Sequence, residues 1–147
     1  MDKGKQTGVQ EKVSVEFESY SHNEQFARVV TAVFMARLNP TMEELEDVKT
    51  AVSEAVTNCV IHGYEDRIGT IRMELTCDQG QLTVEITDRG TGIGNIVQAR
   101  EPLYTTGSME ERSGMGFTVM ETFMDTVEVS SSLGLGTVVK MSKRLQG

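Results

Sequence analysis

Several stretches of the chain alternate hydrophobic and polar residues, the pattern of a strand that buries one face. The first runs through Val13, Val15 and Phe17. Two more lie on either side of residues 78–80, whose composition is typical of a turn, and they predict an antiparallel hairpin. Their hydrophobic positions are Ile71, Met73, Leu75 and Cys77, then Leu82, Val84 and Ile86. Two closing strands are expected around residues 134–136, from Val127 and Val129, then Val138, Val139 and Met141.

Three other stretches space their hydrophobic residues as a helix does. The first two follow Ser21 and Thr41, which stand three residues before Glu24 and Glu44, the spacing of a capping box. The second helix should end near Gly63. The expected hydrophobic faces are Phe26, Val29, Val30, Val33, Phe34 and Leu38, then Leu45, Val48, Val52, Ala55, Val56 and Cys59. A third, short helix is expected to start at residues 114–116 and to bury Phe117, Met120, Phe123 and Met124.

These elements predict a single domain of the α+β class. The chain has 147 residues, of which 38% are hydrophobic, and this suits one domain of common size. We expect a two-layer sandwich over residues 13–147, with a mixed, mostly antiparallel sheet and the helices on one face. Residues 1–12 are polar and aperiodic, which predicts a disordered arm or a remnant of protein expression.

The charge and the cysteines exclude several classes of protein. The formal net charge is −8, so neither DNA phosphates nor anionic lipids attract this surface. The sequence has no hydrophobic run near the roughly 20 residues of a membrane span and no signal peptide, and we expect a cytoplasmic protein. Cys59 and Cys77 lack the spacing of a zinc site, and a disulfide is not expected in a reducing compartment.

Glu54 and Asn58 stand four residues apart, so they are neighbours on one face of the second helix, roughly opposite its hydrophobic face. A carboxylate can accept a proton, and a carboxamide oxygen can bind Mg²⁺. A solvent-exposed helix face can carry the same two residues. The pair alone does not separate these interpretations.

Two glycine-rich segments are further candidates. Asp88 ends a strand and precedes Gly90 and Gly92, where a carboxylate can accept a hydrogen bond from the amine of a planar base that the glycines let approach. An Asx turn is the structural alternative. Residues 112–116, Arg-Ser-Gly-Met-Gly, precede a helix, and the free N–H groups of a helix start can bind phosphate. An ordinary glycine-rich helix entry is the alternative here.

The order of these motifs resembles the Bergerat-fold ATP-binding family, which includes histidine kinases, gyrase B, Hsp90 and MutL. The motifs are SEAVTN followed by HG, then DRGTG, then GMGF, and the resemblance spans residues 13–143. The segments SEAVTNCVIHGYE, REPLYTT and ERSGMGFTVMETFMD are similar to the anti-sigma serine kinases, in particular to their sporulation branch.

The resemblance implies ATP or ADP and Mg²⁺ as cofactors, with Glu54 as general base toward a substrate serine and Asn58 as the Mg²⁺ ligand. It implies that Asp88 accepts from the adenine amine, that Arg112 is a catalytic cation in a lid over the phosphates, and that Arg28 contacts protein partners. The implied nucleotide-contacting residues are Asn58, Asp88, Gly90, Gly92, Ile93, Thr105, Thr106, Ser113, Gly114 and Gly116.

The function implied by the resemblance is that of a homodimeric protein serine kinase. It would sequester a sporulation sigma factor, sigma F, from RNA polymerase in an ATP-dependent manner and phosphorylate an anti-anti-sigma protein on serine. Three alternatives stay open: an anti-sigma kinase of a general stress pathway, an ATP-binding module without phosphoryl transfer, and a structural domain without ligand. The sequence has no P-loop motif and no HRD or DFG motif, which argues against Walker NTPases and ordinary protein kinases.

Overall fold

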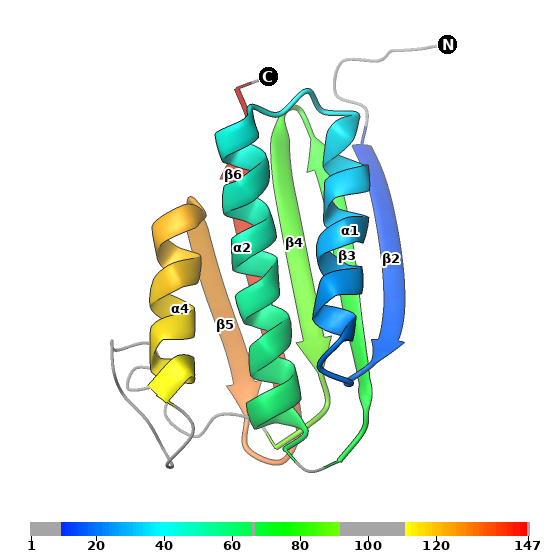
Figure 1. The fold of residues 1–147 in the computed structure, drawn as a ribbon, viewed down its shortest axis with the longest axis vertical. Coiled ribbons are helices and arrows are strands. Elements are labelled where there is room, and N and C mark those ends of the chain that lie inside the picture. Colours follow the sequence, from blue (N-terminus) through cyan, green and yellow to red (C-terminus); the bar gives the residue numbers. More distant parts are fainter. Residues whose placement is uncertain (1–9, 66, 92–110, 147) are drawn as a thin grey trace.

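The computed structural model describes residues 10–65, 67–91 and 111–146, with the backbone alone at residues 10 and 111–115. Five strands form one sheet in the order β2-β3-β4-β6-β5, and helices cover one of its faces (Figure 1). The strands are β2 (Gln10–Glu18), β3 (Thr70–Asp78), β4 (Gln81–Asp88), β5 (Thr126–Ser132) and β6 (Gly136–Arg144). The helices are α1 (Asn23–Ala36), α2 (Met42–Asn58) with a π-helical turn η1 (Cys59–Gly63), and α4 (Glu111–Phe123).

The two-layer α+β fold expected from the sequence is confirmed. Its sheet differs from the expectation in one respect, because all four strand pairings are antiparallel and none is parallel among the described strands. The hydrophobic core lies between the sheet and the helices. Its largest fully buried side chains include Val48, Val52 and Val56 of α2 and Ile71, Met73, Leu75, Ile86 and Met141 of the sheet.

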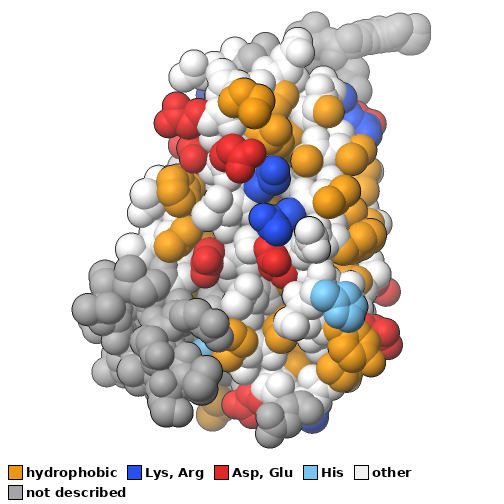
Figure 2. All heavy atoms as spheres, in the orientation of Figure 1, with side chains coloured by type: hydrophobic (Ala, Val, Ile, Leu, Met, Phe, Trp, Pro, Cys, Tyr) orange, Lys and Arg blue, Asp and Glu red, His pale blue; other side chains and the backbone are white. Residues whose placement is uncertain are grey.

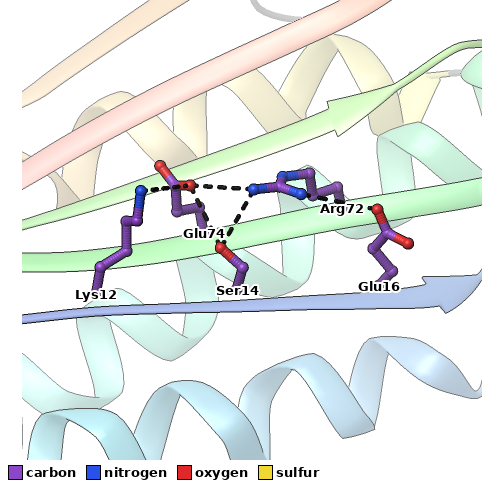
Figure 3. Close-up of polar contacts among 5 residues, drawn as sticks. All are labelled: Lys12, Ser14, Glu16, Arg72 and Glu74. Atoms are coloured by element: carbon purple, nitrogen blue, oxygen red, sulfur yellow. Dashed lines mark hydrogen bonds and ion pairs between the residues drawn. The ribbon is translucent and has the colours of Figure 1, made fainter.

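The first strand begins at Gln10, three residues before the expected start at Val13. Glu11 and Lys12 pair with Cys77 and Thr76 of β3, so the backbone ladder continues where the hydrophobic alternation has stopped. On the helix-free face, Lys12 approaches Glu74, to which Ser14 donates a hydrogen bond (Figure 3). The predicted first residue of the strand was wrong because ladder hydrogen bonds need no hydrophobic side chain at the end of an edge strand.

The start of α1 has no capping box, contrary to expectation. Its N-cap residue is His22, which makes no capping hydrogen bond with its side chain. The carboxylate of Glu24 instead accepts a hydrogen bond from Ser53 of α2 and pairs with the Nε of Arg28 at 2.7 Å. Glu24 therefore joins α1 to α2 rather than closing the first turn of α1.

The hydrophobic face expected for α1 is also partly wrong. The residues that the helix buries are Ala27, Thr31, Phe34 and Met35. Phe26, Val29 and Val33 are 45%, 56% and 63% exposed. Because α1 is the outermost helix of its layer, near the edge strand β2, no further described helix covers its outer flank. Hydrophobic side chains consequently run along α1 on the surface (Figure 2).

The capping box at the start of α2 is confirmed. Thr41 Oγ1 accepts from the backbone N–H of Glu44 at 3.0 Å, and Glu44 Oε1 accepts from the N–H of Thr41 at 2.9 Å. The second carboxylate oxygen of Glu44 accepts from the N–H of Gln146 at 2.9 Å. One side chain thus joins the start of α2 to the C-terminal end of the chain.

We expect Glu44→Gln to lower the free energy of unfolding by about 1–3 kcal/mol, because a charge-assisted acceptor of two backbone amides is lost. The amides of Thr41 and Gln146 hold the pKa of Glu44 below its ordinary value. The stabilisation is therefore complete above the ordinary pKa of glutamate and is lost as the pH falls through the lowered pKa. Urea denaturation between pH 3 and pH 7 measures it. Glu43→Gln, on an exposed neighbour in the same turn, is the matched control and should change little.

Candidate functional site

Glu54 and Asn58 lie on the side of α2 that faces α4. A Cβ atom built at Gly116 of α4 would stand 3.2 Å from Asn58 Nδ2 and 3.4 Å from Glu54 Oε1. Gly116 therefore lets the two helices approach while both polar side chains lie between them, and α2 and α4 run side by side in Figure 1. The interpretation of Glu54 and Asn58 as a fully solvated face is wrong, since both side chains are half-buried at this contact.

The helix α4 begins at Glu111, three residues before the expected start at Gly114. The four free N–H groups of its first turn thus belong to residues 111–114, and Gly116 lies in the second turn. Packing of Phe117 and Met120 against the core offsets the cost of about 1 kcal/mol for each helical glycine. Arg112, Ser113 and Gly114 consequently lie inside the first helical turn rather than in a preceding loop.

Asp88 is the last residue of β4, and only 4% of it is exposed. Its Oδ1 accepts a hydrogen bond from the N–H of Gly90 at 2.8 Å. Burial raises the pKa of this carboxyl above its ordinary value, an effect that the N–H of Gly90 and the thiol of Cys59 partly oppose. A buried carboxylate with raised pKa at a strand end is typical of a binding or catalytic site.

The turn η1 brings the end of α2 against Asp88. A Cβ atom at Gly63 would lie 2.8 Å from the Asp88 carboxyl, and one at Gly90 would lie 1.7 Å from the Gly63 carbonyl oxygen. Only glycine fits at these two positions. Thr91 adds two hydrogen bonds, from its N–H to the carbonyl of Gly63 at 2.8 Å and from its hydroxyl to the carbonyl of His62 at 2.9 Å. Single turns of π-helix often occur at functional sites.

The structure thus places four of the expected site residues, Glu54, Asn58, Asp88 and Gly116, around one end of α2. Gly90 contacts this group through Gly63. The expected contacts of Gly92, Ile93, Thr105 and Thr106 lie outside the described residues, as do those of the side chains of Arg112 and Ser113. Arg28 lies on α1 and is half-exposed; its ion-pair partner Glu24 reaches Ser53, the residue before Glu54.

Gly63 and Tyr64 are site residues that the sequence interpretation missed. The sequence predicts Gly63 as the end of a helix, and the family resemblance includes it with His62, but neither assigns it a contact with Asp88. Tyr64 is buried, and its hydroxyl contacts the carbonyl of Thr70 at the start of β3 and the N–H of Arg89, the residue after Asp88. A large aromatic residue after a helix-ending glycine was the available signal.

The donor set fits a nucleotide with Mg²⁺. Among the described residues, no group of three or more His, Cys, Asp or Glu side chains is arranged to hold a metal ion alone. Mg²⁺ is commonly bound through one or two protein oxygens together with substrate phosphates. Asn58 can supply such an oxygen, and the absence of a Cβ at Gly63 lets the backbone approach the Asp88 carboxylate closely.

Comparison with known proteins gives a consistent family. Residues 18–143 match the histidine kinase-like ATPase domain family. The chain is 59% identical over 134 residues to the anti-sigma F factor of Clostridium beijerinckii, covering 90% of this chain and 94% of that protein. It is 55% identical over 131 residues to the anti-sigma F factor of a Thermoanaerobacter species, covering 89% of this chain and 92% of that protein.

Solved structures agree in fold. The RsbU and RsbW domains of a Mycobacterium tuberculosis protein match with a TM-score of 0.68 and 17% identity, over 92% of this chain and 32% of that chain. The histidine kinase domain of a blue-light activated kinase from Erythrobacter litoralis matches with a TM-score of 0.53 and 25% identity, over 70% of this chain and 45% of that chain. In the described part of the chain, no helix has the length and hydrophobicity of a membrane span.

Proposed function

This chain belongs to the anti-sigma F factors, within the histidine kinase-like ATPase domain family, and we propose that it acts as an ATP-dependent protein serine kinase. In this proposal it sequesters the sporulation sigma factor sigma F and phosphorylates an anti-anti-sigma protein on serine. The observation that supports the proposal is that Gly116 approaches both Glu54 and Asn58, the two side chains proposed as proton acceptor and metal ligand.

The proposed nucleotide pocket is built around Asp88. The carboxylate accepts hydrogen bonds from the N–H of Gly90, the thiol of Cys59 and the backbone of Thr137. Its two oxygens together can accept about four hydrogen bonds, so capacity remains for the exocyclic amine of adenine. The glycines at positions 63 and 90 let this acceptor lie directly against the neighbouring backbone. Burial of the carboxylate strengthens its hydrogen bonds, because water competes poorly there.

The proposed chemistry takes place at Glu54. Mg²⁺-ATP, when bound, supplies the γ-phosphoryl group and charge neutralisation. The carboxylate of Glu54 accepts the proton of the substrate serine hydroxyl, and the carboxamide oxygen of Asn58 is the protein ligand of the metal. Both groups project from the rigid, buried helix α2, which holds them in a fixed relation to one another. Positioning is the larger part of catalysis in phosphoryl transfer.

Labelled ATP, Mg²⁺ and candidate anti-anti-sigma proteins, mixed with the purified chain, test this function. We expect one candidate to acquire phosphoserine. Thermal stabilisation by ATP without transfer would favour a pure binding module, and capture of a stress-response sigma factor would favour the general stress pathway. ATP at 100 times its Kd should stabilise the protein by about 2.7 kcal/mol. If ATP at 100 times any plausible Kd gives no stabilisation, only the interpretation as a structural domain without ligand remains.

The exposed flank of α1 supports a homodimer as the proposed assembly. Phe26, Val29 and Val33 form one hydrophobic stripe, and Phe26 also stacks edge-on against Phe17 of β2, with ring centroids 5.8 Å apart. A stripe of this kind on a small protein marks a contact surface. A second copy of the chain can cover it by burying the same stripe across a two-fold axis. Arg28 lies on the same helix but on the flank that faces α2, where it pairs with Glu24, so the proposed sigma contact and the proposed dimer contact use different flanks of α1.

We expect Val33→Glu to weaken self-association at least tenfold, because a carboxylate would be buried in a hydrophobic contact. Sedimentation across a range of protein concentrations measures the dimer dissociation constant. Leu135→Glu, at a 76% exposed position in the turn between β5 and β6, is the matched control. Equal dissociation constants for the wild type and Val33→Glu would show that the stripe on α1 is not the dimer contact.

A further inference from the structure

Tyr64 lies at the point where η1, β3 and β4 meet. It follows η1 directly, and only 4% of it is exposed. Its hydroxyl donates a hydrogen bond to the carbonyl oxygen of Thr70 at 2.5 Å and accepts one from the N–H of Arg89 at 2.8 Å. Thr70 begins β3, and Arg89 is the first residue after β4. The hydroxyl thus joins the backbones of two neighbouring strands at their site end.

The register of β3 and β4 explains what this hydroxyl does. Their last ladder pair at this end is Ile71 with Asp88, so the next pair in the same register would be Thr70 with Arg89. The Tyr64 hydroxyl stands between the carbonyl and the N–H of that pair and satisfies both. A hydroxyl can donate and accept at once, whereas a phenyl ring can do neither. The two strands therefore separate one residue beyond Asp88, while the carbonyl of Thr70 and the N–H of Arg89 keep a hydrogen-bond partner.

This separation determines where the segment after Asp88 runs. Arg89 is held by Tyr64, and Thr91 is held by the carbonyls of His62 and Gly63. Between them, the N–H of Gly90 is directed to Asp88 Oδ1. The ring of Tyr64 is itself confined, since a Cβ atom at Gly69 would stand 2.2 Å from its Cε1. The Tyr64 hydroxyl thus fixes the position of Arg89, and with it the segment in which the N–H of Gly90 bonds Asp88 Oδ1.

We propose that Tyr64 is a positioning residue for nucleotide recognition, whose hydroxyl orients the Asp88 carboxylate toward adenine by spacing the ends of β3 and β4. The proposal rests on the proposed function, because it takes adenine as the group that Asp88 reads. The Tyr64 hydroxyl bonds the backbone groups of Thr70 and Arg89, and it acts on Asp88 through Arg89 and Gly90.

The test compares ADP with inosine diphosphate, which has a carbonyl oxygen in place of the adenine amine. Calorimetry with Mg²⁺ gives the two dissociation constants for the wild type and for Tyr64→Phe. We expect the wild type to prefer ADP and Tyr64→Phe to reduce that preference about tenfold, the effect of losing one well-aligned hydrogen bond. In the kinase assay, the KM for ATP should rise with kcat nearly unchanged.

Thr31→Val is the matched control, because Thr31 is also a buried hydroxyl that donates to a backbone carbonyl, at 2.8 Å, far along α1 from the site. It should lower stability without changing the preference for ADP. Gly69→Ala keeps the hydroxyl but displaces the ring, and it should reduce the preference as Tyr64→Phe does. A wild type without preference for ADP would contradict the proposed function, whereas an unchanged preference in both Tyr64→Phe and Gly69→Ala would overturn the role of Tyr64 alone.

Discussion

Replacing Glu54 with glutamine is expected to slow serine phosphorylation by about 10²- to 10⁴-fold, the usual contribution of a general base. Glutamine keeps the shape of the side chain and its contact with Gly116, but it cannot accept the serine proton. Binding of ATP should be nearly unchanged, because Asn58 and the Asp88 pocket stay in place. Single-turnover transfer of labelled phosphate to the anti-anti-sigma protein measures the rate, and calorimetry measures the affinity.

Arg28→Gln provides the complementary variant. It removes the cation proposed to contact the sigma factor, without adding a second carboxylate beside Glu24. We expect it to bind nucleotide normally and to lose sigma binding, whereas Glu54→Gln should capture sigma and fail to phosphorylate. Phosphorylation by Glu54→Gln at the wild-type rate would mean that another group, or none, accepts the serine proton.

The second large effect is expected from Asp88→Asn, which should weaken binding of ATP and ADP by about 10- to 100-fold. The carboxylate has two acceptor oxygens, and one of them is already taken by the N–H of Gly90. Asparagine has a single acceptor, so whichever way its amide turns, an N–H group faces either Gly90 or the adenine amine. Isothermal calorimetry measures the loss.

Asp125→Asn is the matched control, because the Asp125 carboxylate also accepts a backbone N–H, from Arg144 at 2.7 Å, but lies on the surface.

The pH dependence gives a second check on the role of Asp88. Since burial raises the pKa of Asp88, the folded protein without nucleotide keeps this proton to higher pH than the unfolded chain does. The contribution of Asp88 to stability is therefore complete below the ordinary aspartate pKa of about 3.9 and is lost as the pH rises through the raised pKa, while nucleotide affinity rises over the same range. Unchanged affinity of Asp88→Asn for ATP and ADP would show that Asp88 does not bind adenine.

Much of the fold was predictable from the sequence because the strands and the helix α2 have a clear hydrophobic period. The hairpin of β3 and β4 and the capping box of Thr41 with Glu44 are examples in which local sequence determines local structure. The exposed stripe of α1 was not predictable. Periodicity finds all hydrophobic positions of a helix, but it cannot tell a flank that packs on the core from a flank that lies at the edge of the layer.

The candidate site residues were predictable where a family motif includes them, and less so where their role depends on tertiary contacts. Glu54, Asn58 and Asp88 lie around one end of α2, and a local pattern marked each of them. The start of α4 was misplaced because the propensity of glycine predicts a loop where packing against α2 makes a helix. The role of Tyr64 depends on a strand register and on two backbone groups distant in sequence, which no local pattern records.

The helix α2 gives the site a dynamic property as well as a geometry. Five of its residues, Val48, Ala51, Val52, Ala55 and Val56, are completely buried in the centre of the core. Amides in such an element exchange with solvent only when the whole domain opens, so α2 belongs to the last cooperative unit to unfold. Glu54 and Asn58 share that unit. Local fraying elsewhere in the molecule therefore leaves the two side chains in place. Heating should disrupt their arrangement only at the temperature at which the entire domain melts.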